Sequence, residues 1–439
     1  SLYVSPTNIQ RPRTGLATVA LGLLAYDLSG DRAGLVLGTV FTIKMVAYVG
    51  IAPVAGAFAN HWPRRSMLVS LDLVRAAVAL CLPFVTQVWQ VYVLIFVLQS
   101  ASAAFTPTFQ ATIPDILPQE DRYTRALSLS RLAYDLENII SPTMAAILLV
   151  FVSYQALFFG TVIGFVGSAL LVVSVLLPSP QETTRRGIYD RTTRGLRIYL
   201  ATPRLRGLLS LNLAAAAAGA MVLVNTVVLV RSDLGFDDTR VAIALAAFGS
   251  GSMLAALVLP RLLDHRPDRP VMIGGAAVLV AILLGLALMT VINGVGWTVL
   301  LAGWLVIGVG YSTILTPSGR LLKRSAHPED RPAVYAAQFA LSHACWLVTY
   351  PLAGWLMTVA GAATAFVTLA VLAAIGLAGA LVFWPKREAE VLQHTHENLT
   401  DDHPHVRHGR SHAHPYIIDD HHPHWPPVTK AGYPNTGDE

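Results

Sequence analysis

The C-terminal part of the chain concentrates side chains that bind metal ions. Ten of the fourteen histidines fall in one stretch, at His394, His396, His403, His405, His408, His412, His414, His421, His422 and His424. Carboxylates are interleaved with them, for example in Asp401-Asp402 and Asp419-Asp420. Neutral imidazole suits Ni²⁺, Co²⁺, Zn²⁺ and Cu²⁺, and carboxylates can complete the shell. The pattern predicts a metal-binding tail, and a solvated linker that is rich in histidine by chance is the alternative.

The same tail contains prolines at positions that interrupt a regular helix, namely Pro404, Pro415, Pro423, Pro426 and Pro427. We therefore expect residues 385–439 to be a flexible, disordered chelator. Because flexible ligands lose entropy when they are ordered around an ion, each site should have moderate affinity and low selectivity.

A second group of chemically active residues lies inside apolar segments, where ionisable side chains are costly and are candidates for function. The densest set is Arg131, Asp135, Glu137 and Asn138. Arg131, Asp135 and Asn138 share one helical face, and Glu137 lies on an adjacent face. The two carboxylates could bind a hydrated divalent cation or exchange protons for it. A structural ion pair is the alternative, and for Arg131 it is the preferred one.

Three further ionisable residues lie in other apolar segments. Lys44 is near the middle of its segment and needs a partner, for which Asp135 and Glu137 are the candidates. Asp27 lies at the end of the first segment, where hydration is easy and a structural role is expected. His343 is a candidate intramembrane ligand, although a lone histidine is more often a packing residue.

The elements that position these residues are apolar helices. Of 439 residues only 13% are charged and 54% are hydrophobic, whereas a soluble domain carries roughly 25% charged residues. Apolar stretches of about twenty residues recur, as a bilayer with a hydrocarbon core of ~30 Å requires. We predict an all-α membrane protein with twelve spans at 15–28, 34–59, 67–86, 88–113, 126–151, 156–177, 208–230, 241–259, 271–292, 297–315, 334–358 and 362–384.

Two of these spans have features of their own. The apolar run Gly15–Leu28 is shorter than the ~20 residues needed to cross a bilayer, so we expect a truncated first helix or a misplaced start of the chain. The span 67–86 carries Asp72 and Arg75 one turn apart, and we expect them to form a local ion pair.

Basic residues predict the orientation. With the N-terminus inside, the inner loops and the start of the tail carry 20 Lys and Arg residues, and the outer loops carry only Arg32, Arg231 and Arg240. This bias follows the positive-inside rule and places both termini in the cytoplasm. Topology thus explains the net charge of +5 without a nucleic-acid partner.

The two halves of the chain repeat each other. The segment 60–65 resembles 264–269, Trp89 matches Trp297, and Thr106-Pro107 matches Thr316-Pro317, always at a separation of 204 to 210 residues. A constant offset indicates a duplicated six-helix unit. We therefore expect an N-terminal half at 1–177, a cytoplasmic central loop at 178–207, a C-terminal half at 208–384 and the tail at 385–439. Parallel repeats place a substrate site between the halves, near the middle of the membrane.

The loop between the second and third spans carries a family resemblance. It reads Gly56-Ala57-Phe58-Ala59-Asn60-His61-Trp62-Pro63-Arg64-Arg65, which is similar to the loop signature of the major facilitator superfamily at Gly56, Arg64 and Arg65, with Asn60 in place of the usual acid. The second half keeps Asp264 and Arg269 of the repeated signature. The resemblance implies the major facilitator fold and assigns these residues to a loop that controls the conformational change.

A narrower resemblance follows from the fourth and fifth spans. The stretch Phe105–Ala111, followed by Pro114, Pro118, Glu120 and Ser141-Pro142, is similar to the macrolide-efflux-like branch of drug exporters, the drug:proton antiporter-3-like group. Together with the histidine-rich tail, the chain looks most like the nickel-resistance transporters of the NreB type.

This resemblance implies a secondary active exporter of nickel or cobalt, coupled to protons, that acts as a monomer in the bacterial inner membrane. Its partners would be the lipid bilayer, protons and transition-metal ions, the last as substrate or tail ligand, and no other cofactor is expected. An exporter of organic drugs with an incidental tail and a non-transporting, membrane-anchored metal buffer are the alternatives. No enzymatic activity is expected, and no phosphate-binding loop of an ATPase is present, so an ion gradient would supply the energy.

Overall fold

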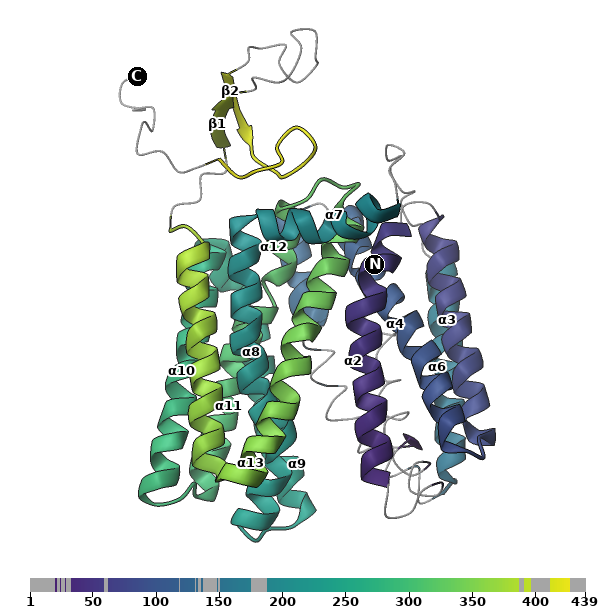
Figure 1. Cartoon of the computed structure of the whole chain (residues 1–439), viewed down its shortest axis with the longest axis vertical. Coiled ribbons are helices and arrows are strands. Elements are labelled where there is room, and N and C mark those ends of the chain that lie inside the picture. Colours follow the sequence, from purple (N-terminus) through teal and green to yellow (C-terminus); the bar gives the residue numbers. More distant parts are fainter. Residues whose placement is uncertain are drawn as a thin grey trace.

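A computed structural model shows that the chain folds into two bundles of long helices (Figure 1). The structure describes residues 33–58, 62–117, 119–130, 151–174, 188–386, 391–395 and 411–426, with a few isolated residues between 20 and 28 and between 132 and 148. Most of the predicted spans 15–28 and 126–151 therefore lies outside the described residues.

The N-terminal bundle contains α2 (Ala33–Phe58), α3 (Arg64–Cys81) with the short turn η3 (Leu82–Phe84), α4 (Val88–Ile116) and α6 (Tyr154–Ser174). The C-terminal bundle contains α8 (Pro203–Val228) with η4 (Leu229–Asp233), α9 (Asp238–His265), α10 (Asp268–Ile292), α11 (Trp297–Leu315), α12 (Ser318–Arg324) and α13 (Arg331–Phe383). Within the described ranges, nine helices are long and apolar enough to cross a membrane. The chain is thus a multi-pass membrane protein.

Helix α13 accounts for two of the predicted spans. Gly361 interrupts it with a φ of 79°, a conformation that side chains other than glycine rarely adopt. The chain reverses there, so the spans predicted at 334–358 and 362–384 are the two arms of this element. With the other eight helices, ten of the twelve predicted spans are confirmed.

The internal repeat is visible in where the helices begin. Helices α3 and α10 start at Arg64 and Asp268, 204 residues apart. Helices α4 and α11 start at Val88 and Trp297, 209 residues apart. Figure 1 shows the two bundles side by side, with α2 and the first arm of α13 where they meet.

Close packing of α2 against α13 joins the bundles. A Cβ atom added to Gly56 would lie 2.5 Å from the Cβ atom of Ala336, so only glycine lets the two backbones approach this closely. Further along the same contact, Ala52 of α2 packs in one apolar cluster with Phe339 and Ala340 of α13. The Gly56 position of the loop signature is therefore a packing position at this contact.

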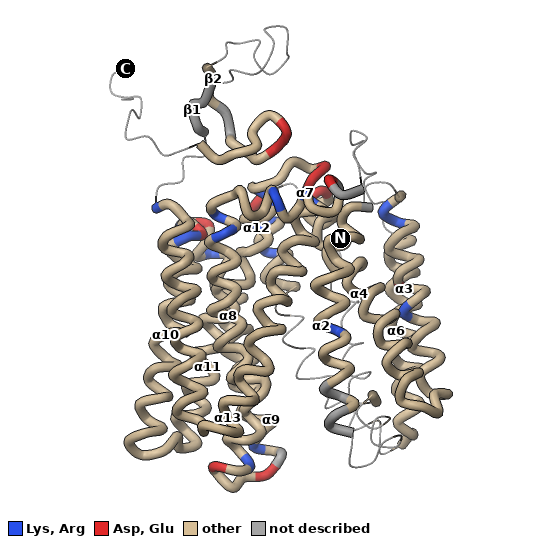
Figure 2. Tube along the Cα trace, in the orientation of Figure 1, with Lys and Arg blue, Asp and Glu red and all other residues tan. Residues whose placement is uncertain are grey.

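The segment predicted as a central loop contains a helix, α7 (Ile188–Ala201). It lies across one end of the two bundles, which we call the α7 end (Figure 1). A Cβ atom on Gly195 would lie 2.1 Å from the carbonyl oxygen of Ala333, so α7 rests directly on the start of α13. Many of the Lys, Arg, Asp and Glu residues gather at the α7 end, as Figure 2 shows.

Part of the histidine-rich tail is ordered, which corrects the expectation of a disordered tail for the residues that are described. Strands β1 (Val391–Thr395) and β2 (Ser411–Pro415) pair in antiparallel register, with His394 opposite His412. Beyond β2, Tyr416 and Ile418 are buried in the apolar core that also contains the C-terminal bundle. These apolar residues lie between the histidines and prolines of the tail, and the burial of their side chains orders the segment.

The ion pair predicted between Asp72 and Arg75 is confirmed. The guanidinium of Arg75 donates a hydrogen bond to Asp72, and both residues are buried in α3. The same guanidinium lies 4.0 Å from the centre of the Phe105 ring and 4.8 Å from that of Phe165. The pair therefore packs α3 against α4 and α6, and it serves the structure of this bundle.

One buried hydrogen bond inside the C-terminal bundle leads to a stability prediction. The indole N–H of Trp304 donates to the hydroxyl of Thr226 over 2.7 Å, and both side chains are almost fully buried. We expect Thr226→Val to lower the stability by roughly 0.5–2 kcal/mol, because it leaves the indole N–H without its acceptor inside the protein. Unfolding in detergent, followed by Trp fluorescence, measures this loss. Thr358→Val is the matched control, since Thr358 is exposed and bonds only within its own helix; an equal loss in both variants would contradict the prediction.

Candidate functional site

Two of the ionisable residues singled out in the sequence meet where the bundles touch. Lys44 lies on α2 and its ammonium nitrogen is 5.6 Å from the centre of the Tyr48 ring, one turn further along. The Tyr48 ring centre is 4.8 Å from that of His343 and 4.9 Å from that of Phe339, both on α13. A cation of the N-terminal bundle and an imidazole of the C-terminal bundle thus share one tyrosine ring. We call Lys44, Tyr48, Phe339 and His343 the inter-bundle cluster.

A hydrogen bond fixes the chemistry of the imidazole in this cluster. The Nδ1 atom of His343 lies 2.7 Å from the carbonyl oxygen of Phe339. Because a carbonyl oxygen only accepts, Nδ1 must carry the proton, and in the neutral ring Nε2 then keeps the lone pair. His343 therefore presents a proton acceptor on the ring nitrogen that the helix does not use.

Aromatic side chains continue from the cluster into the C-terminal bundle. Trp346 and Tyr350 follow His343 along α13, and their ring centres are 4.7 Å apart. The Trp346 ring is 6.2 Å from Tyr311, which in turn is 5.5 Å from Phe248. A Cβ atom on Gly219 would lie 2.4 Å from the Trp346 ring, so a glycine in α8 makes room for this indole. We call these four rings the aromatic row.

Nearer the α7 end, ionic contacts join the two bundles. Asp115, at the end of α4, accepts from Arg64 of α3 over 2.5 Å and from Arg331 at the start of α13. All three side chains are largely buried, so the attraction is weakly screened by water. One carboxylate therefore holds an arginine from each bundle.

A second set of contacts lies beside the first. Arg320 of α12 pairs with Glu120 of the N-terminal bundle at 2.8 Å and with Asp268 of α10 at 3.1 Å. The hydroxyl oxygens of Tyr123 and Tyr335, one from each bundle, are 2.6 Å apart. Burial raises the pKa of Tyr123, so its hydroxyl stays protonated at neutral pH and can take part in this hydrogen bond. These contacts and those of Asp115 form what we call the gate layer, and it is closed at the α7 end.

The structure brings some of the predicted site residues together and not others. Lys44 and His343 meet in the inter-bundle cluster, Arg64 belongs to the gate layer, and Arg65 donates to a backbone carbonyl of α6. Asp264 is exposed at the end of α9, whereas the nearby Asp268 pairs with Arg320 and Arg324. Arg269 donates to the backbone carbonyl of Trp384 over 2.9 Å. The residues outside the described part of the chain are Asp27, Asn60, Arg131, Asp135, Glu137 and Asn138.

Most contacts of the gate layer could not be predicted from the sequence. Asp115 and Arg331 come from helix ends 216 residues apart, and nothing local indicates that they meet. The internal repeat did contain one indication. Asp268 is the first residue of α10 and occupies the position equivalent to Arg64, the first residue of α3. An acid at that repeated position could have identified Asp268 as the partner of a basic residue.

The metal-binding role of the tail remains a prediction. Among the residues that the structure describes, no group of three or more His, Cys, Asp or Glu side chains is placed to hold a metal ion. Most of the tail histidines lie outside that part of the chain or have side chains that are not described there. Those whose side chains are described are His421, His422 and His424.

The sequence is similar to that of known membrane transporters. The profile of the Major Facilitator Superfamily matches residues 13–295 and 208–418. A chloramphenicol resistance protein of Streptomyces lividans is 28% identical over 277 residues, which cover 61% of this chain and 68% of that protein. Macrolide efflux protein A of Streptococcus pyogenes is 24% identical over 167 residues, which cover 37% of this chain and only 41% of the relative.

The fold is also similar to that of a solved transporter. The crystal structure of the human organic anion transporter MFSD10 superposes with a TM-score of 0.73, at 12% sequence identity. The match covers 85% of this chain and 97% of the human protein, so both bundles take part in the likeness.

Proposed function

The chain belongs to the major facilitator superfamily, and on that premise we propose that this transporter is a secondary exporter of small organic molecules, driven by protons that enter the cell. It is a membrane transporter and not an enzyme. The names of the two similar resistance and efflux proteins support export as the direction of transport.

The proposal for the substrate rests on one observation, the chemistry of the side chains in the inter-bundle cluster and the aromatic row. A mainly aromatic lining with a few polar groups is typical of sites that bind small organic molecules. In this arrangement the ammonium of Lys44 would bind an acceptor or anionic group of that molecule, and the Nε2 atom of His343 would accept a hydrogen bond from one of its hydroxyl or N–H groups. The positive charge of Lys44 would in contrast repel a divalent metal ion in the same place.

The proton step is assigned to His343. Its free Nε2 atom can take up a proton, and the resulting imidazolium would repel Lys44 across the Tyr48 ring. Protonation also turns Nε2 from an acceptor into a donor, so a proton and a hydroxyl or N–H group of the substrate would compete for the same nitrogen. This negative linkage is the property that an exchanger needs. We further propose that the α7 end faces the cytoplasm of a bacterial inner membrane, since basic residues gather at that end (Figure 2).

Export of nickel or cobalt is the second candidate, and the ten histidines of the tail favour it. Under this alternative Asp135 and Glu137 would supply the carboxylates of the transport site. A membrane-anchored metal buffer without transport would use the tail alone.

A tolerance panel separates these functions. We expect a pump-deficient bacterial host that expresses the chain to tolerate more chloramphenicol and macrolide, because export lowers the internal concentration, and to show unchanged tolerance of NiCl₂ and CoCl₂. A variant that lacks residues 394–424 serves as the control and should keep the drug tolerance. Tolerance of the metals alone would contradict the proposal, and if the tail fused to an unrelated anchor gave the same metal tolerance, the buffer would be the correct function.

A further inference from the structure

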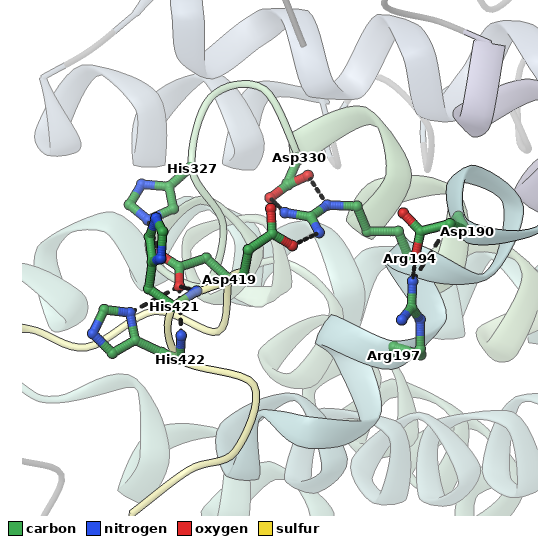
Figure 3. A network of polar contacts seen from close by, with 9 residues as sticks. Asp190, Arg194, Arg197, His327, Asp330, Asp419, His421 and His422 are labelled. Atoms are coloured by element: carbon green, nitrogen blue, oxygen red, sulfur yellow. Dashed lines mark hydrogen bonds and ion pairs between the residues drawn. The ribbon is translucent and has the colours of Figure 1, made fainter. Parts of the chain in front are cut away.

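The ordered end of the tail is tied to the transporter by a shared arginine. Arg194 of α7 donates to Asp330, the residue that precedes α13, with Nη2 and Oδ2 2.7 Å apart. The same guanidinium donates to Asp420 of the tail over 2.8 Å (Figure 3). The next residue after Asp330 is Arg331, which belongs to the gate layer. The tail thus contacts α7, and through Arg194 it is connected to Asp330, the residue next to Arg331 of the gate layer.

A second acid of the tail organises the same region. One carboxylate oxygen of Asp419 accepts hydrogen bonds from the backbone N–H groups of His421 and His422 and from Nδ1 of His422, each over 2.8 Å. Its other oxygen lies 3.4 Å from Nε2 of His327, in the loop before α13 (Figure 3). Although burial alone would raise it, the bonds from His327 and His422 hold the pKa of Asp419 well below its usual range. Asp419 is therefore a carboxylate that contacts both the tail and the transporter.

Apolar side chains complete the contact. The rings of Tyr416 and Trp425 are 5.3 Å apart, and Tyr416 donates to the backbone carbonyl of His424 over 2.8 Å. The guanidinium of Arg204, at the start of α8, lies 5.7 Å from the Trp425 ring. Residues 416–425 thus form a compact unit with its own ring packing and hydrogen bonds, which we call the strap.

We propose that the strap is a metal-released brake, which stabilises the closed gate layer when docked and is pulled away when its histidines bind a divalent transition-metal ion. Arg194 connects Asp420 to Asp330, so docking restrains α7 and the start of α13 together. The gate layer opens only if α13 moves relative to the N-terminal bundle, because Arg331 is bound to Asp115.

The position of the His422 imidazole explains why metal binding would release the strap. Its side chain is 2% exposed, and its Nδ1 atom is bonded to Asp419. A metal ion needs accessible nitrogen lone pairs and a choice of several ligands around it. His422 can join His421 and His424 around an ion only by leaving the docked position. Docking and metal binding by this segment therefore compete, and each must weaken the other by the same factor. The inference holds whichever substrate is exported.

Hydrogen exchange in helix α7 tests the proposal on the full chain in lipid nanodiscs, with NiCl₂ as the probe. Residues 188–201 contain no histidine, so a change in their exchange does not arise from direct ligation. We expect Ni²⁺ to speed exchange in α7 by about threefold to tenfold, the factor that one partly buried ion pair contributes to local opening. A double variant, Asp420→Asn with Trp425→Ala, should exchange fast without Ni²⁺ and should bind Ni²⁺ more tightly by a similar factor.

The matched control is Asp233→Asn, an exposed acid in η4 at the opposite end of the bundle, which should leave α7 exchange and its response to Ni²⁺ unchanged. Saturating Ni²⁺ that leaves the exchange of α7 unchanged in the native chain would overturn the proposal. So would a double variant whose Ni²⁺ affinity equals that of the native chain. Neither result bears on the export of organic molecules, which the tolerance panel tests separately.

Discussion

An Asp115→Ala variant is expected to lose nearly all transport while it still inserts in the membrane. Among the residues that the structure describes, Asp115 is the carboxylate that binds both Arg64 and Arg331, and removing it leaves two largely buried guanidinium groups facing each other. Loss of one partner from a buried ion pair costs about 3–5 kcal/mol. Because these contacts join the bundles only when the gate layer is closed, most of this cost should fall on the closed state. The conformational equilibrium should then shift by more than about a hundredfold towards a state open at the α7 end.

Cys345 offers a natural reporter for that shift. It lies two residues after His343 in α13 and is half-buried, whereas the other cysteine, Cys81, is exposed. In a Cys81→Ser background, a polar maleimide should label Cys345 faster in Asp115→Ala than in the native sequence. Asp121→Asn, an exposed acid on the helical segment that follows Asp115, is the control and should behave like the native chain. Equal labelling together with full transport in Asp115→Ala would show that the gate layer does not control access.

His343→Gln and Lys44→Met are expected to impair transport in two different ways. Glutamine keeps a polar side chain but cannot be protonated, so His343→Gln should abolish uptake driven by a pH gradient in everted vesicles and preserve exchange of substrate for substrate. Lys44→Met removes a charge-assisted contact worth about 1.5–3 kcal/mol, so it should raise KM by about tenfold to a hundredfold in both assays.

The controls make the same chemical changes away from the cluster. His265→Gln and Lys386→Met alter exposed residues at the end of α9 and after α13, and both should transport normally. If His343→Gln lost exchange and gradient-driven uptake equally, the imidazole would be needed for substrate binding or packing and not for the proton step.

Local pattern was enough to predict most of the fold. A membrane span is defined by the length of its apolar run, so α8 or α10 can be read from about twenty neighbouring residues without knowledge of the rest. The same is true of the bond between Asp72 and Arg75, which one helical turn brings together. Helix α7 was missed because it crosses no membrane, although the spacing of Ile198 and Gly195, which both face inwards, is helical.

The candidate site was predictable only in part. Lys44 and His343 were identified because ionisable residues are rare in apolar segments, but the ring of Tyr48 that connects them was not. Asp135 and Glu137 were predicted as partners of Lys44. Both lie outside the described residues, so this pairing remains a hypothesis. The docking of the tail depends on Arg194 and Asp420, 226 positions apart, and a contact of that range leaves no periodic signal in one sequence.

Uptake into everted membrane vesicles tests the central claim, the export of organic molecules through the inter-bundle cluster, most directly. Vesicles that carry the native chain and an imposed pH gradient, acid inside, should accumulate labelled chloramphenicol or macrolide but not ⁶³Ni²⁺. The accumulation should disappear when the gradient is collapsed and should be absent with His343→Gln. Gradient-driven accumulation of ⁶³Ni²⁺ without that of either drug would contradict the account.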